Sequence, residues 1–167
     1  MYIDLNKNPK MNSMINPKMN SMINPKTNSM INPKTNSMIN PKTNSMINPK
    51  TNSMINPKTN SMINPKMNSM INPKINSNIN PKINVNFNGL LYFNLKNELD
   101  YFCINANEEI LLIFDLNLIL AYFAVKHTQK GYVVFNNDND FIFHLENDSK
   151  AGFNIFDLSN EWVGFLK

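Results

Sequence analysis

The residues that could support catalysis are few and do not form a recognisable group. The chain contains two histidines, His127 and His144, and one cysteine, Cys103. A nucleophilic enzyme needs its nucleophile beside a base that a third group orients. No serine is placed beside a histidine with an orienting acid, and the sequence has neither a glycine-rich phosphate loop nor a C-x-x-C pair. We therefore predict that the protein is not an enzyme and uses no cofactor.

Methionines three residues apart suggest a second kind of chemistry, because thioether sulfur is a ligand for Cu(I). Such pairs occur in the first half of the chain, at Met11 and Met14, Met19 and Met22, and Met67 and Met70. The copies between them have threonine in place of the first methionine. Because most copies lack the pair, we predict no metal site.

The histidines and the cysteine also fit structural roles. His144 takes a position that holds phenylalanine in the related segments described below, so we expect it in a barrel wall. His127 lies in the polar segment 126–130, for which a solvated loop is the simplest interpretation. Cys103 cannot form an internal disulfide, and we expect it to act as a small apolar filler.

Charge is divided between the two halves of the chain. Residues 1–88 hold eleven lysines and one acid, whereas residues 89–167 hold five lysines and eleven acids. Halves of opposite charge suggest two modules that have different partners or that attract each other. The repeats lack arginine and interleaved aromatic residues, which disfavours a nucleic-acid partner. An anionic membrane surface is the favoured partner, with a contact made by Lys26, Lys34, Lys42, Lys50 and Lys58.

Residues 1–88 are an array of the octapeptide N-P-K-x-N-S-M-I, and all ten prolines of the protein lie in it. A proline at every eighth position excludes an α-helix, and Asn-Pro favours a turn after an extended approach. Two interpretations remain open. Near-identical copies favour a β-solenoid with isoleucine facing inward, whereas the small apolar content of each copy favours an extended or disordered spacer.

Residues 89–167 contain four copies of a 21-residue unit. In each copy a central phenylalanine is followed by Asn or Asp, and a large apolar residue comes six positions after it. Apolar arms around a polar loop predict a β-hairpin. A lone hairpin is marginally stable, so we predict that the four close into a small all-β barrel with pseudo-four-fold symmetry. The central residues are Phe93, Phe114, Phe135 and Phe156, and the later ones are Leu99, Leu120, Phe141 and Trp162.

The pattern G-x-x-x-F-D-L-x-x-x-W/L-x-G-F, clearest in residues 152–167, resembles that of the four-fold β-flower family. The resemblance implies a shallow, four-fold symmetric β-barrel with an apolar central channel. The likeness of that family to Tubby-type lipid-binding barrels further implies lipid binding. This sequence departs from the pattern at Asn94, Ile110, Asn136, Asn137 and His144.

We therefore predict a binding module that holds an apolar or lipid-like group in the centre of the barrel. Symmetry would bring Phe93, Phe114, Phe135 and Phe156 to the axis. Because alternate residues of a strand face opposite sides, the set Leu99, Leu120, Phe141 and Trp162 is the rival lining. The alternative function is a structural spacer and protein-interaction protein, in which the barrel core is filled and binds no ligand.

Two features of the sequence concern the cellular location of the protein: its first ten residues and its longest apolar run. The first ten residues show neither an apolar segment nor a cleavage site, so we expect no signal peptide. The longest apolar run, residues 110–125, is too short for a membrane span and contains Asp115 and Asn117. We interpret that run as a buried hairpin, and the default location is the cytoplasm.

Overall fold

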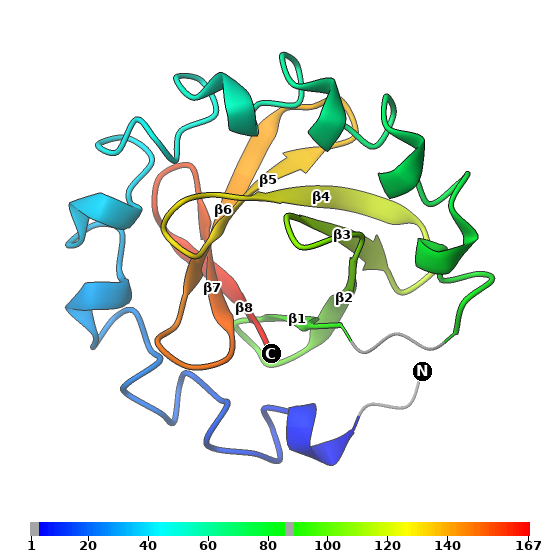
Figure 1. Cartoon of the computed structure of the whole chain (residues 1–167). Coiled ribbons are helices and arrows are strands. Elements are labelled where there is room, and N and C mark those ends of the chain that lie inside the picture. Colours follow the sequence, from blue (N-terminus) through cyan, green and yellow to red (C-terminus); the bar gives the residue numbers. More distant parts are fainter. Residues whose placement is uncertain (1–3, 86–88) are drawn as a thin grey trace.

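A computed structural model describes residues 4–85 and 89–167. The second half of the chain is a closed antiparallel barrel in which each strand pairs with its neighbours in sequence and β1 pairs with β8 (Figure 1). The predicted all-β class and closed barrel are therefore confirmed. The strands are β1 (Leu91–Asn94), β2 (Leu99–Asn105), β3 (Ile110–Asp115), β4 (Leu120–Lys126), β5 (Tyr132–Asn136), β6 (Phe141–Asn147), β7 (Phe153–Asp157) and β8 (Trp162–Leu166).

The apolar run at residues 110–125 forms β3 and β4, which are paired with each other. Its interpretation as a hairpin is confirmed. Asp115 and Asn117 lie at the turn, where Asp115 Oδ1 accepts hydrogen bonds from the backbone of Asn117 and Ile119, both at 2.9 Å. In the part of the chain that the structure describes, no helix has the length and apolarity needed to cross a membrane.

A β-bulge precedes each central phenylalanine. Tyr92 pairs with Tyr101 but Phe93 pairs with Leu99, so that Asp100 is left without a partner in the register. The same shift separates residues 113 and 114, 134 and 135, and 155 and 156. A bulge adds one residue to a strand and so changes which side chains share a face. Leu99 and Phe102 therefore point to the same side although they are three residues apart.

The interior of the barrel is filled by one buried cluster, to which every strand contributes. We call it the interior cluster: Tyr92, Cys103, Leu111, Ile113, Ala124, Val134, Leu145, Ile155 and Leu166. Apart from Tyr92, these are residues of small and medium size that pack across the axis, as expected for a barrel of eight strands. Cys103 lies among them and is 1% exposed, which confirms it as an apolar filler. Burial raises the pKa of its thiol to about 12.

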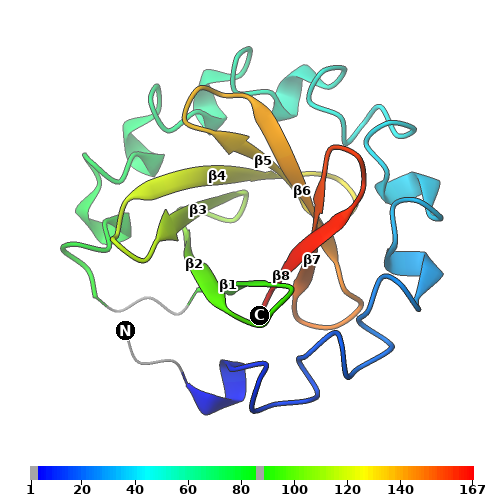
Figure 2. The same cartoon turned by 180° about the vertical axis from the view of Figure 1, so that it is seen from behind.

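The octapeptide array forms a belt that surrounds the barrel (Figures 1 and 2). Residues 4–85 contain turns and short 3₁₀-helices and no strand, so the β-solenoid interpretation does not hold for them. The array is not a spacer that extends away from the barrel either. The 3₁₀-helices are η1 (Leu5–Lys7), η2 (Ser29–Ile31), η3 (Ser37–Ile39), η4 (Ser53–Ile55), η5 (Ser61–Ile63), η6 (Ser69–Ile71) and η7 (Ser77–Ile79).

Asparagine side chains replace the backbone ladder that the belt lacks. Asn52 illustrates the pattern: its Oδ1 accepts a hydrogen bond from the backbone of Met54 at 3.1 Å, and its Nδ2 donates to the carbonyl of Met46 at 2.6 Å. The asparagine before each proline accepts from the lysine backbone two residues later, as Asn48 does from Lys50 at 2.9 Å. These are N-cap and Asx-turn contacts, and they join each copy to the one before it.

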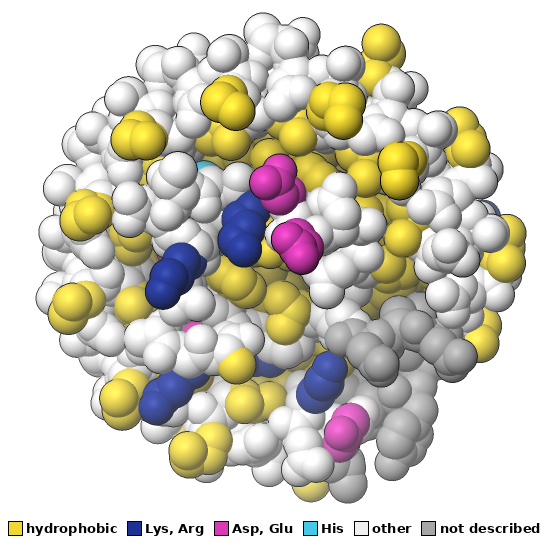
Figure 3. Space-filling model, viewed as in Figure 1, with side chains coloured by type: hydrophobic (Ala, Val, Ile, Leu, Met, Phe, Trp, Pro, Cys, Tyr) yellow, Lys and Arg dark blue, Asp and Glu magenta, His cyan; other side chains and the backbone are white. Residues whose placement is uncertain are grey.

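The proline and the last isoleucine of the octapeptide face the barrel, whereas methionine faces outward. All ten prolines of the array are buried. Isoleucines of the belt pack on the outside of the barrel in what we call the outer cluster: Ile55, Ile63, Ile71, Ile79, Leu91, Phe93, Phe102, Ile110, Leu112, Phe114, Phe123, Val125, Val133, Phe135 and Phe165. The belt therefore covers apolar surface that the barrel would otherwise expose to water. The methionines lie on the rim, and Figure 3 shows hydrophobic side chains at intervals along it.

Candidate ligand-binding groove

The central phenylalanines lie outside the barrel and not at its axis. Phe93, Phe114 and Phe135 belong to the outer cluster that contains the isoleucines of the belt. Phe156 stacks on His144, with ring centroids 5.4 Å apart. The expected position of these residues, in the centre of the barrel, is therefore corrected: the interior cluster occupies that space.

The rival set lies on the same outer side. Leu99, Leu120, Phe141 and Trp162 are partly buried against the outer cluster. Strict alternation would place the two sets on opposite faces, but the bulge before each phenylalanine changes the phase. Neither set lines the barrel axis.

Two of the five lysines expected at an anionic surface already face acidic side chains of the barrel. Lys34 forms an ion pair with Glu161, and Lys58 Nζ lies 2.9 Å from Asp140 Oδ1. Lys42 and Lys50 line a small groove with Phe141 and His144. Lys26 bonds through its backbone to Asn24 Oδ1 at 2.8 Å, and none of the grooves described here includes it. The opposite charges of the two halves therefore attract each other within one molecule.

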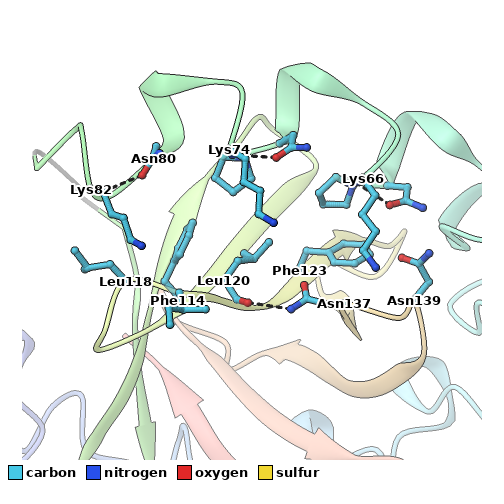
Figure 4. Close-up of a pocket in the computed structure, with 15 residues that line it drawn as sticks. Lys66, Lys74, Asn80, Lys82, Phe114, Leu118, Leu120, Phe123, Asn137 and Asn139 are labelled. Carbon is cyan, nitrogen blue, oxygen red and sulfur yellow. Dashed lines mark hydrogen bonds between the residues drawn. The ribbon is translucent and has the colours of Figure 1, made fainter.

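A larger groove lies between the belt and the turn that joins β3 and β4. It has a volume of about 400 Å³, which lies within the range of about 300–1,000 Å³ usual for small-molecule sites. Its floor is apolar and consists of Phe114, Leu118, Leu120 and Phe123. Lysines of three successive belt copies, Lys66, Lys74 and Lys82, extend from the other wall towards this floor (Figure 4).

Leu118 holds a conformation that disfavours leucine. Its φ is 64°, in the left-handed region. The turns β1–β2, β5–β6 and β7–β8 place asparagine at the equivalent position, Asn97, Asn139 and Asn160, with φ between 61° and 65°. Asparagine tolerates this region, whereas a side chain such as leucine costs about 1–2 kcal/mol there. The β3–β4 turn keeps Leu118 in this unfavourable conformation, which places an apolar side chain in the groove.

Among the described residues, the lysines of the groove have no acidic partner. The ion pairs among residues 4–85 and 89–167 include none of Lys66, Lys74 and Lys82. Ile119 also lines the groove, and its apolar side chain offers these lysines no negative charge. The buried Oδ1 of Asn139, at the same groove, also has no hydrogen-bond partner among the described residues. The groove therefore combines an apolar floor, three cations and an unused acceptor.

Next to the smaller groove, a buried polar network joins the barrel to the belt. Glu146 Oε1 lies 2.7 Å from His144 Nδ1 and 3.3 Å from His127 Nε2. His144 Nε2 lies 2.9 Å from Asn160 Oδ1, and Asn160 Nδ2 donates to Asn40 Oδ1 of the belt at 3.0 Å. His127 is 5% exposed, so the expectation of a solvated loop residue was wrong. The signal that could have located this network is the pair of polar residues, His144 and Glu146, in a strand whose counterparts are apolar.

The hydrogen bonds of the network define its protons. The backbone of Gln129 donates to His127 Nδ1, so the neutral ring carries its proton on Nε2, facing Glu146. His144 donates from Nε2 to Asn160, so when its ring is neutral Nδ1 accepts the proton of the Glu146 carboxyl group. Burial lowers the pKa of His127 to about 3 and that of His144 to about 4, and raises the pKa of Glu146.

Both histidines are therefore neutral near pH 7 and burial favours the neutral form of Glu146, although the spacing of the three groups resembles that of ion pairs. Neither ring nitrogen of His144 is available to act as a base, because both are hydrogen-bonded and the residue is fully buried. The described residues also contain no group of three or more His, Cys, Asp or Glu that could hold a metal ion. This network is a structural link between the barrel and the belt, and the lysine-lined groove is the candidate site.

Comparisons with protein-family models, with curated proteins and with solved structures find no match to this chain. The resemblance to the four-fold β-flower family therefore rests on the sequence pattern alone, and the groove is interpreted from its own geometry.

Proposed function

We propose that the protein is a binding module for a small amphiphilic, lipid-like molecule, which lies in the groove between the belt and the β3–β4 turn. The proposal keeps the expected ligand class but moves the ligand from the barrel centre to the outside of the barrel. It also keeps the four hairpins as quasi-equivalent units, with a bulge that recurs in each unit. One of these units has diverged to make the site.

The observation that carries the proposal is Leu118. A leucine held at φ 64°, where three equivalent turns have asparagine, is unfavourable for folding. Strained residues gather at functional sites, where another gain maintains them. Here the gain is an apolar side chain on the floor of a groove that already contains Phe114, Leu120 and Phe123.

The test is binding of decanol, a neutral chain, measured by isothermal titration calorimetry on the full chain. Leu118→Asn gives the turn the residue of the other three turns, so the variant should be more stable by about 1 kcal/mol and should bind decanol at least threefold more weakly. Leu116→Asn is the matched control, because Leu116 lies in the same turn, is 53% exposed and does not line the groove. Equal affinities of the two variants and the wild type would reject the groove as the site.

A protein-interaction role is a second candidate, which the exposed methionines of the belt favour. Met30, Met54 and Met70 are each at least 74% exposed, and methionine suits adaptable binding surfaces. Changing these three residues to glutamine should abolish any self-association that analytical ultracentrifugation detects in the wild type. If the wild type stays monomeric at every concentration, this role loses its support as far as copies of the chain are concerned.

A further inference from the structure

The belt and the barrel meet in a fixed register. Lys34 pairs with Glu161 and Lys58 pairs with Asp140. Lys58 lies three octapeptides after Lys34 in the sequence. Asp140 lies one hairpin unit before Glu161. Three copies of the belt therefore correspond to one hairpin, and the two elements run around the molecule in opposite directions.

The next step of this register identifies a missing ion pair. Three more octapeptides along the belt lead from Lys58 to Lys82, and one more hairpin unit back along the barrel leads from Asp140 to Ile119. Lys82 and Ile119 both line the groove, as the register requires. The position that holds a lysine-paired carboxylate in the β5–β6 and β7–β8 turns holds an apolar side chain here, while its lysine is retained.

We propose that the groove takes a single-chain aliphatic carboxylate, and that Lys82 binds its carboxylate in place of the acidic side chain that Ile119 replaces. This inference rests on the proposed function and specifies its ligand. The head group is assigned as a carboxylate because the carboxylate of Asp140 or Glu161 pairs with a belt lysine at the equivalent position of the β5–β6 and β7–β8 turns. The aliphatic chain then extends over Leu118, Leu120 and Phe123, with Lys74 as a second cation near the head group.

The belt offers close internal controls for this assignment. Lys26, Lys74 and Lys82 occur in the same N-P-K context, but only the last two line the groove. In the β3–β4 turn, Leu116 is exposed outside the groove and Ile119 lies in it, so a glutamate at either position changes the net charge equally. A difference between members of these pairs cannot come from net charge alone.

The experiment compares decanoate with decanol by calorimetry on the full chain, below the micelle-forming concentration of decanoate. For the wild type we expect decanoate to bind at least tenfold more tightly than decanol. Ile119→Glu restores the ion pair with Lys82 and should remove this preference, while Leu116→Glu should retain it. Lys82→Gln should also remove the preference and Lys26→Gln should retain it, so the assignment does not depend on one variant.

The outcomes separate this inference from the function on which it rests. If decanoate and decanol bind the wild type equally, or if Ile119→Glu and Lys82→Gln behave like their controls, the carboxylate assignment is overturned while the groove remains a site for apolar chains. If neither compound binds the wild type, the proposed function itself fails and the assignment fails with it.

Discussion

At the scale of single residues, asparagine determines the local structure of the belt. Asn52 accepts a hydrogen bond from Met54 and donates one to Met46 of the preceding copy. The abundance of asparagine is visible in the sequence, but this joining of copies does not follow from the sequence alone. The structure shows it, because the Oδ1 and the Nδ2 of one asparagine bond to residues of different copies.

The two contacts of Asn52 can be measured separately. Asn52→Asp keeps the acceptor and loses the donor, whereas Asn52→Ala loses both. We expect the alanine variant to be destabilised by about 1 kcal/mol, the usual cost of removing an N-cap, and the aspartate variant to lie between it and the wild type. Denaturant unfolding checks this order. An aspartate variant less stable than the alanine variant would contradict this order, and would mean that a carboxylate oxygen facing the Met46 carbonyl costs more than the cap contributes.

The buried network gives the protein a predictable response to acid. The pKa values of His127 and His144 are lowered to about 3 and about 4 because burial disfavours their charged forms. Their contribution to stability is full above the unfolded value of about 6.5 and is lost as the pH falls towards the folded values. The raised pKa of Glu146 acts in the opposite sense, since its contribution is full below about 4.5 and declines as the pH rises.

On unfolding in this pH range, the two histidines take up protons and Glu146 releases one. The free energy of unfolding should therefore decline as the pH falls from 6.5 to 4.5. The two histidines alone would give a slope of at most about 2.7 kcal/mol per pH unit, the value for two protons, and the proton that Glu146 releases on unfolding reduces it. The double variant His127→Gln/His144→Phe, which gives residue 144 the phenylalanine found in the other copies, should lose this decline. Chemical denaturation at several pH values checks the prediction. A decline as steep in the variant as in the wild type would place the titrating groups elsewhere.

At the scale of elements, the sequence predicted the hairpins well and the belt poorly. The 21-residue period, the turns that begin with Asn or Asp, and the apolar arms are local signals, and they were sufficient for eight strands in a closed barrel. The bulge at residues 92–93 is not visible from alternation, and it places Leu99 on the same outer side as Phe93. The belt depends on contacts between segments more than a hundred residues apart, such as Asn40 with Asn160, and no local pattern predicts them.

The register of the belt makes the number of internal copies important. Deleting residues 43–50 would remove one octapeptide between Lys34 and Lys58, so their ion pairs with the barrel could not both form. Deleting residues 8–15 removes the same number of residues before these contacts. We expect the internal deletion to lower the melting temperature more than the terminal deletion does. Equal effects would favour the spacer role, in which copy number matters little.

At the scale of the whole molecule, belt and barrel share one core. The outer cluster contains isoleucines from the belt and phenylalanines from the barrel. Neither element can leave without exposing that apolar surface, which makes separate unfolding costly. The division of the sequence by composition and charge near residue 88 is therefore a division between two layers of one folded unit.

A shared core predicts a single unfolding transition. The fluorescence of Trp162, which packs against the outer cluster, should report the barrel. Hydrogen exchange of amides such as Ile55 and Ile63, which bond within the belt, should report the belt. The two probes should give the same free energy of unfolding within error. Exchange of the belt amides at much lower free energy would mean that the belt detaches while the barrel stays folded.

Photo-crosslinking can locate a bound chain, and so tests directly whether the groove between the belt and the β3–β4 turn is the binding site. A decanoate analogue with a diazirine on its chain would be irradiated with the full protein and the labelled peptides identified by mass spectrometry. We expect labels on residues 118–123 and on the facing belt residues 64–82, which excess decanoate suppresses. Labels on Leu111, Ile113 and Val134 of the barrel interior, or spread evenly over the exposed methionines of the rim, would contradict this expectation.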